Sequence, residues 1–218
     1  MKNMIWSPDT ALKAYLHTVQ SCGNFKESGV PELLSAMAAG WNSTLIVESW
    51  THGDPLATSV ALSLAARYTH GRHVCLVPDE RSRSEYVKSV QRAGVSAKTE
   101  VMVGEAEEIM ATLTGVDFLV VDCKRRDFVR VLRFAKLSHK GAVLVRKNAY
   151  QSSLSGFRWL GALAKGTRVV RSVFLPVGKG LDVAHVEING GVACSRSCPS
   201  RWIKFVDQKS GEEHVFRG

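Results

Sequence analysis

The sequence predicts an α/β fold with a doubly wound sheet of about seven strands, mostly parallel, ending in an antiparallel hairpin and covered by helices on both faces. Two observations support this prediction. Short β-branched runs alternate with segments of helical periodicity along most of the chain. Two long apolar runs are joined only by Gly178-Lys179-Gly180, and so short a connection requires antiparallel strands.

Each expected strand is a short run rich in aliphatic and β-branched residues. In chain order the expected strands are residues 44–48, 73–77, 100–103, 117–122, 142–145, 168–177 and 181–188. The run at 117–122 is almost continuously apolar, which is typical of a strand buried on both faces.

Capping signals mark where the helices begin and end. Ser7-Pro8 is an N-cap followed by proline at the first helical position, and this helix is expected to end at Gly23. By the same signal, Asp54-Pro55 is predicted to begin the helix that ends near Tyr68. Further helices are expected at residues 31–39, 83–92, 105–113, 129–137 and around 154–163.

We divide the chain into N-terminal helices (1–42), a sheet domain (43–189) and a C-terminal appendage (190–218) packed on the same domain. The appendage is polar and rich in Gly and Ser, with a possible small hairpin from residues 202–205 and 214–216. An odd number of cysteines suits reduced thiols better than a disulfide framework. No apolar run is long enough to span a membrane and no secretory signal is recognisable, so we expect a cytoplasmic or nuclear protein without a membrane partner.

The net charge of +9 is unevenly distributed. Residues 1–123 carry a net charge of −4, whereas residues 124–218 carry +13. A basic C-terminal half favours an anionic partner, although a basic solvated surface is an equally good interpretation.

Several stretches resemble class I S-adenosylmethionine-dependent methyltransferases, and the nearest relatives look like catechol and caffeoyl-CoA type O-methyltransferases. The most specific is Leu175-Pro176-Val177-Gly178-Lys179-Gly180-Leu181, which is similar to the L-P-x-G-x-G-L turn between the last two strands of those enzymes. The others are residues 45–65, 92–95, 104–106, 118–122 and 141–148. The resemblance covers roughly residues 30–189 and implies a Rossmann-like methyltransferase domain that binds S-adenosylmethionine. The whole chain also resembles a plant family of methyltransferase-like proteins of unassigned role.

The resemblance implies a cofactor loop of the form E-x-G-x-x-x-G after the first strand. Glu48 matches its acid, but Trp50 and Asp54 stand at the glycine positions and Gly53 is out of register. Glycine lets the backbone approach a ligand closely, so the Trp50 indole is expected to occupy cofactor space unless the loop is rebuilt. Glu48 either contacts the ligand or caps loop amides. His52 is either a proton carrier or a solvated loop histidine.

The other cofactor contacts that the resemblance implies follow the second and third strands. Pro78 stands where the family has its ribose-binding acid, with Asp79 and Glu80 directly after it. Asp79 therefore either binds the ribose or caps the following helix. Gly104-Glu105 resembles the family's G-D-A segment, whose acid lies near the adenine, although an acid at a helix start is also favoured by the helix dipole.

The catalytic candidates are Asp122, Lys147 and Asn148. Asp122 matches the family's first metal-binding carboxylate, whereas Lys147-Asn148 falls where the family has Asp-Asn, and Arg125 replaces the catalytic lysine. A lysine cannot ligate the same cation, and an arginine is no general base near neutral pH. We therefore expect no metal, and we hypothesise that Lys147 supplies the missing positive charge by pairing with Asp122.

The sequence contains two more clusters of chemically reactive or charged residues. A basic cluster beside the cleft is either an anion site or a solvated face, and consists of Arg125, Arg126, Arg130, Arg133, Lys136, Arg146 and Lys147. Cys194 and Cys198 alone do not make a zinc site, which would need two further ligands such as His214.

These observations favour an S-adenosylmethionine-binding methyltransferase-like protein acting on a small molecule, with metal-independent transfer where activity survives. The alternative is a catalytically silent binding or regulatory module that acts through its basic surface. An RNA-binding function would rest on charge alone.

Overall fold

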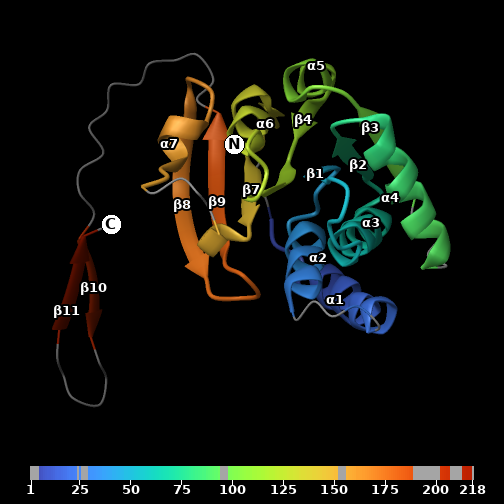
Figure 1. Cartoon of the computed structure of the whole chain (residues 1–218). Helices are drawn as coiled ribbons and strands as arrows, with labels where there is room; N and C mark the ends of the chain where they lie inside the picture. The colour runs from blue at the N-terminus through green and yellow to red at the C-terminus, as the bar shows by residue number, and fades with distance from the viewer. Residues whose placement is uncertain are drawn as a thin grey trace.

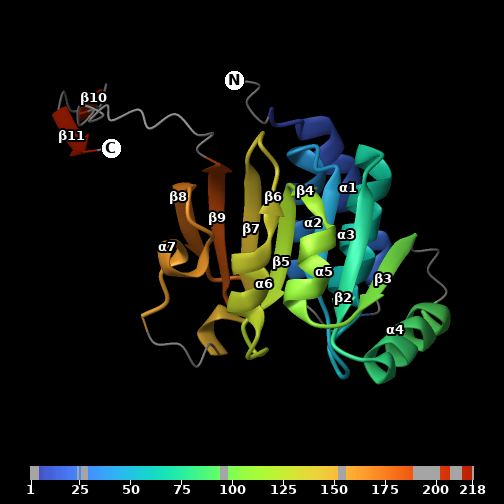
Figure 2. The ribbon, with the colours of Figure 1, turned by 90° about the horizontal axis from the view of Figure 1, so that it is seen from above.

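The computed structural model describes residues 5–23, 25, 29–93, 98–151 and 156–188, together with the backbone of 202–206 and 213–217. Its centre is one seven-stranded sheet in the order β3-β2-β1-β5-β7-β9-β8 (Figures 1 and 2). The first five strands of that order are mutually parallel, and β9 is antiparallel to both β7 and β8. The predicted fold class is confirmed, including the hairpin joined by Gly178-Lys179-Gly180.

The strands coincide closely with the predicted apolar runs. They are β1 (Leu45–Ser49), β2 (Arg72–Val77), β3 (Thr99–Val103), β5 (Phe118–Asp122), β7 (Ala142–Lys147), β8 (Thr167–Leu175) and β9 (Leu181–Ile188). Every residue of β5 and β7 is buried, as expected for strands covered on both faces.

Helices cover both faces of the sheet (Figure 2). They are α1 (Pro8–Cys22), α2 (Val30–Gly40), α3 (Ala57–Thr69), α4 (Glu80–Arg92), α5 (Ala106–Thr112), α6 (Phe128–Phe134) and α7 (Trp159–Ala162), with a 3-10 turn η1 (Ala149–Gln151). One apolar cluster joins α1, α2 and α3 to the sheet through Ile46, Phe118 and Val145. A second joins α5, α6 and α7 to the opposite face through Val47, Leu119 and Leu144.

Four predicted boundaries are wrong. The helix expected at residues 83–92 begins at Glu80, because Asp79 is its N-cap. The helix after β1 begins at Ala57 with Leu56 as its N-cap, because the Asp54 carboxylate accepts the Thr51 N–H (3.0 Å) within the loop. α6 ends at Phe134, and the next residues form β6 (Lys136–Leu137), which pairs with β4 (Thr114–Val116). The last predicted helix is shortened to α7, and residues 152–155 lie outside the described part.

The small C-terminal hairpin is present as β10 (Trp202–Val206) and β11 (Glu213–Arg217), which pair antiparallel. The packing of the appendage on the main domain, and the division into 1–42, 43–189 and 190–218, stay predictions. Cys22, Cys75 and Cys123 are buried, and Cys75 and Cys123 are free thiols. Cys194 and Cys198, with the zinc hypothesis, fall outside the described residues. Among the described helices, none is both long and apolar enough to cross a membrane.

Candidate functional site

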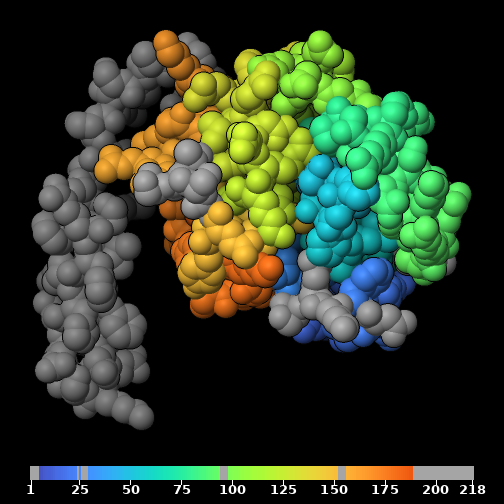
Figure 3. Space-filling model, viewed as in Figure 1, coloured from blue at the N-terminus to red at the C-terminus, as the bar shows by residue number. Residues whose placement is uncertain are grey.

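The candidate site is the edge of the sheet where the parallel strands end. Because β3, β2, β1, β5 and β7 run in the same direction, the loops that follow them meet at one edge, where ligands of doubly wound sheets bind. In Figure 3 the cyan surface of the segment after β1 lies between the yellow-green surface of the segment after β5 and the green surfaces that follow β2 and β3. All predicted site residues lie on these loops or at the strand ends.

Glu48 is buried in the sheet rather than exposed at its edge, with a side chain only 2% accessible. Its Oε1 accepts a hydrogen bond from the Ser59 hydroxyl and lies 3.3 Å from Nε2 of His73. Burial opposes ionisation, but His73, Ser59 and the charge of Lys147 together hold the pKa of Glu48 below its ordinary value. The carboxylate therefore connects α3 and β2 to β1, and it does so through Ser59 and His73 rather than through loop amides.

Trp50 points into the interior. Its ring is 2% exposed and packs edge to face on Tyr86, with ring centroids 5.3 Å apart. Cys75 and Val60 belong to the same apolar cluster. The loop therefore has a conformation in which the indole does not occupy the expected cofactor space. The indole instead fills the space beneath α3 and α4 and leaves the solvent side of the loop uncovered.

Exposed side chains at this edge of the sheet follow β1, β2 and β3. Asp79 is the N-cap of α4, and its Oδ1 accepts the Ser82 N–H (2.7 Å), an interaction that lowers the pKa of the carboxyl. Glu105 is the exposed N-cap of α5 and lies 3.5 Å from Arg130. Gly53 and Gly104 both have positive φ, which glycine adopts readily.

Asp122, Lys147 and Asn148 come together as predicted from the sequence. Nζ of Lys147 lies 3.4 Å from Oδ2 of Asp122, and both side chains are more than 90% buried. Asn148 donates from Nδ2 to the same oxygen (2.8 Å), while the Lys124 N–H donates to Oδ1 (2.9 Å). Asn148 adopts φ 58°, a left-handed conformation that asparagine tolerates better than most residues. Three donors, from Lys147, Asn148 and the Lys124 backbone, therefore face the carboxylate of Asp122.

This donor set does not fit a divalent cation. Mg²⁺ and Ca²⁺ bind clustered oxygen ligands, whereas an ammonium and an amide N–H already face the Asp122 oxygens. Within the described residues, no group of three or more His, Cys, Asp or Glu side chains is arranged to hold a metal.

Arg125 links two loops of the site. Its guanidinium makes a bidentate contact with Asp127 (2.8 and 2.5 Å) and donates to the Trp50 carbonyl (2.9 Å). Trp50 lies in the loop after β1, whereas Arg125 and Asp127 lie in the loop after β5. Arg125 therefore fixes the two loops relative to each other.

The sequence reasoning missed Asp54 as a site residue, because it treated the position as a lost glycine and a helix cap. The Asp54 carboxylate lies close enough to Lys147 and Asp122 to be affected by their charges, and burial raises its pKa. It also lines a pocket of about 450 Å³, with Ser21, Leu56, Ser89 and Arg92 among its neighbours. Its position in the sequence could have predicted this role, since an acid in the loop after a parallel strand lies at the ligand-binding edge of the sheet.

The predicted basic cluster is largely neutralised by ion pairs. The pairs are Arg125–Asp127, Arg130–Glu107, Arg146–Asp182 and Lys147–Asp122. Arg146 is buried and its guanidinium lies 3.4 Å from the centre of the Phe157 ring. Arg146 and Lys147 therefore contribute to the interior and not to an exposed cationic surface, and an anionic partner stays a prediction.

Solved structures of methyltransferases share this fold. A methyltransferase from Geobacter sulfurreducens is 21% identical, with a TM-score of 0.57 over 84% of this chain and 91% of the other. The O-methyltransferase TomG from Streptomyces achromogenes, solved with S-adenosylmethionine, is 20% identical, with a TM-score of 0.55 over 87% of this chain and 100% of the other. A putative caffeoyl-CoA O-methyltransferase from Staphylococcus aureus is 13% identical, with a TM-score of 0.54 over 78% of this chain and 91% of the other.

These identities establish a shared fold, which agrees with the resemblance to class I methyltransferases. No curated protein matches the sequence. The plant origin that the sequence resemblance implies stays a prediction. A family model described as "Protein of unknown function (DUF1442)" matches residues 1–218, and the chain therefore belongs to the DUF1442 family.

Proposed function

We propose that this protein binds S-adenosylmethionine at the carboxyl edge of β1, β2 and β3 and methylates a small-molecule acceptor without a divalent metal. Structures of the same fold that contain this cofactor support the first part. The observation that carries the proposal is the juxtaposition, at one sheet edge, of the Asp122–Lys147 ion pair with the pocket-lining Asp54.

The cofactor side of the proposal depends on two exposed carboxylates. Asp79 and Glu105 follow adjacent strands, and each carboxylate offers about four acceptor positions, so capping a helix leaves capacity for ligand hydroxyl or amino groups. The inward rotation of Trp50 leaves the loop surface around Gly53 accessible, and an added Cβ at Gly53 would meet nothing within 4 Å.

The acceptor side depends on Asp54. S-adenosylmethionine supplies an electrophilic methyl group, so the protein has to orient the acceptor and take up its proton. A carboxylate with a raised pKa is a better proton acceptor than an ordinary one, and Asp54 has that property and lines a pocket. Lys147 stands where the sequence resemblance implies a metal-binding acid, and its positive charge beside Asp122 supports metal-independent transfer.

Isothermal titration with S-adenosylmethionine and S-adenosylhomocysteine, in Mg²⁺ and in EDTA, tests the binding step. We expect micromolar affinity that is the same in both buffers, and about tenfold weaker binding in Asp79→Asn or Glu105→Gln. Glu187→Gln is the matched control, since this acid lies on β9 and pairs with Arg168. No binding at millimolar ligand, or a requirement for Mg²⁺, would contradict the proposal.

A separate experiment tests the proposed base. With a panel of hydroxyl-bearing acceptors, we measure the rate at which S-adenosylhomocysteine is formed. We expect Asp54→Asn to bind S-adenosylmethionine as the wild type does but to form S-adenosylhomocysteine far more slowly. The rate of the wild type should rise with pH as Asp54 ionises, and the variant should lack that rise. Unchanged turnover in the variant would exclude Asp54 as the base.

A further inference from the structure

A second pocket lies at the opposite edge of the sheet from the candidate site. Its volume is about 570 Å³, within the usual range for small-molecule sites, and its lining includes Ser63, Arg67, His70, Gly71 and Lys98. His70 is the C-cap of α3, and Lys98 directly precedes β3. Gly71 precedes β2, whose six residues separate this pocket from the other edge by roughly 17 Å.

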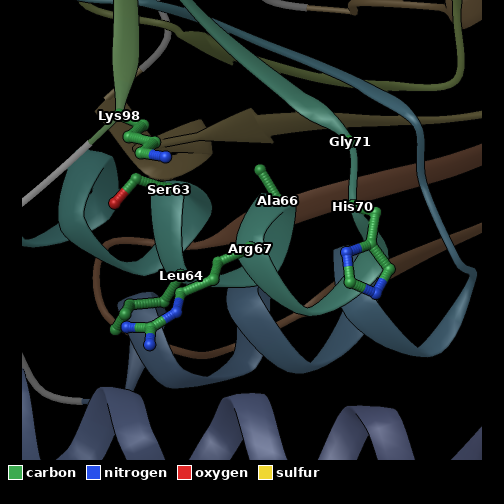
Figure 4. A pocket seen from close by; sticks show the side chains of 7 residues that line it. All are labelled: Ser63, Leu64, Ala66, Arg67, His70, Gly71 and Lys98. Carbon is green, nitrogen blue, oxygen red and sulfur yellow. The ribbon is translucent and has the colours of Figure 1, made fainter.

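Among the described residues that line this α3–β3 pocket, Arg67 and Lys98 are cationic and none is an acid. Arg67 is the only charged residue of α3. Figure 4 shows Lys98 above the Ser63 side chain and Arg67 below it, with His70 toward the end of the helix. In the part of the chain that the structure describes, neither Arg67 nor Lys98 forms an ion pair, which distinguishes them from most basic residues of the candidate site.

The acids nearest to this edge are already engaged. Arg72 holds Glu100 at 2.6 Å. The Asp117 carboxylate accepts hydrogen bonds from both the N–H and the hydroxyl of Thr44 (2.8 Å each) and from the Leu45 N–H (3.0 Å). The positive charges of the pocket therefore lack a protein counter-ion on the elements described around it.

The end of α3 would ordinarily repel an anion, because its last carbonyls carry partial negative charge. Here the Ala66 carbonyl accepts the N–H groups of His70 and Gly71, and the Thr69 hydroxyl also donates to it (3.3 Å). Hydrogen bonding within the protein reduces this repulsion.

The backbone of the pocket is fixed by close packing. A Cβ at Gly71 would lie 2.8 Å from the carbonyl oxygens of Ser43 and Thr44, so only glycine allows β2 to enter the sheet here. The Arg72 N–H also donates to Thr44 (2.8 Å). A pocket on such a frame is formed before a ligand arrives, which lowers the cost of binding.

We propose that the α3–β3 pocket binds the phosphate group of a phosphorylated small molecule. An arginine offers paired N–H donors to phosphate oxygens, and a lysine adds a mobile positive charge. The Ser63 side chain, between them in Figure 4, lines the pocket wall but already donates its hydroxyl proton to the Val60 carbonyl (2.8 Å), so Arg67 and Lys98 carry the proposed recognition. This site is independent of the proposed methyl transfer, since the two lie at opposite edges of the sheet.

The test is calorimetric titration of the whole chain with inorganic phosphate and with AMP, at constant ionic strength. We expect saturable binding that Arg67→Gln and Lys98→Gln each weaken by about tenfold or more, as expected for hydrogen bonds to a charged group. Arg83→Gln and Lys88→Gln on α4 are the matched controls, and they should bind as the wild type does. Tighter binding of AMP than of phosphate, with the same dependence on Arg67, would identify a nucleotide as the ligand.

Three results would overturn the proposal. They are no saturable binding of either probe, an affinity of the Arg67 and Lys98 variants equal to that of the wild type, and a loss of affinity in the two α4 controls as large as in the Arg67 and Lys98 variants. S-adenosylmethionine affinity measured in the same variants should not change. If the wild type does not bind S-adenosylmethionine, the proposed function is contradicted, but the proposal of a phosphate site is unaffected.

Discussion

Trp50 and Tyr86 pack edge to face, with an interplanar angle of 78°, in the apolar cluster between α3, α4 and β2. Trp50, which stands where the methyltransferases that the sequence resembles have a glycine, is therefore a core residue. The side chain that was expected to obstruct a ligand instead attaches α4 to the rest of the fold, and Tyr86 is one of only two residues of α4 that are buried.

We predict that Trp50→Ala destabilises the protein by about 3–5 kcal/mol, as is usual when a large aromatic side chain is removed from a core. Trp50→Phe should cost much less, because it keeps most of the apolar contact and removes a buried indole N–H that has no hydrogen-bond partner among the described residues. Urea denaturation of both variants measures the difference. Tighter S-adenosylmethionine binding by a folded Trp50→Gly variant would show that the indole does obstruct the ligand.

The buried pair of Asp122 and Lys147 gives a second prediction. Lys147→Met leaves the Asp122 carboxylate without its cation in a buried site, and we expect a loss of about 3–5 kcal/mol of stability. The double variant Asp122→Asn with Lys147→Met removes both charges and should recover part of that loss. A double-mutant cycle in urea measures the coupling, and strictly additive effects would show that the two charges do not interact.

The strands were predictable because they depend on local sequence, and the Asp122–Lys147 pairing because the resemblance places both residues at one metal site. A buried strand needs an apolar run, and two side chains at the ends of adjacent parallel strands lie close together. The sequence gives no such indication for Trp50, because its direction depends on the space left by Tyr86 and Val60. Asp54-Pro55 has the composition of a helix start, but the Asp54 side chain closes the loop on Thr51 instead.

Glu48 gives a prediction about pH. Its pKa in the folded protein is lower than the ordinary value of 4.5, so its contribution to stability is present above that value and is lost as the pH falls through the folded pKa. Glu48→Gln should therefore be less stable than the wild type at neutral pH, and the difference should shrink below pH 4.5. Glu100→Gln, which removes an exposed acid paired with Arg72, serves as the control. A constant difference across this range would exclude ionised Glu48 as the cause.

The thiols of Cys75 and Cys123 give a prediction about reactivity. Burial raises the pKa of both, and the nearby Glu48 carboxylate raises the pKa of Cys75 further. Since the thiolate is the reactive form, we expect neither residue to be alkylated by iodoacetamide in the native protein at pH 8, and both to be alkylated in urea. Mass spectrometry of the digested protein assigns the modified residues. Rapid native labelling of Cys75 would mean that α4 opens from the sheet.

The left-handed backbone of Asn148 allows two contributions of this residue to the Asp122–Lys147–Asn148 cluster to be measured separately: its hydrogen bond and its backbone conformation. Asn148→Gly and Asn148→Ala both remove the hydrogen bond to Asp122, but only alanine is strained at φ 58°. We therefore expect the alanine variant to be less stable than the glycine variant by about 1–2 kcal/mol. Because the same backbone turn places Lys147 beside Asp122, the alanine variant should also bind S-adenosylmethionine more weakly if the cluster adjoins the ligand. Equal stability of the two variants in urea would show that the turn relaxes, and that the hydrogen bond alone holds Asn148 in place.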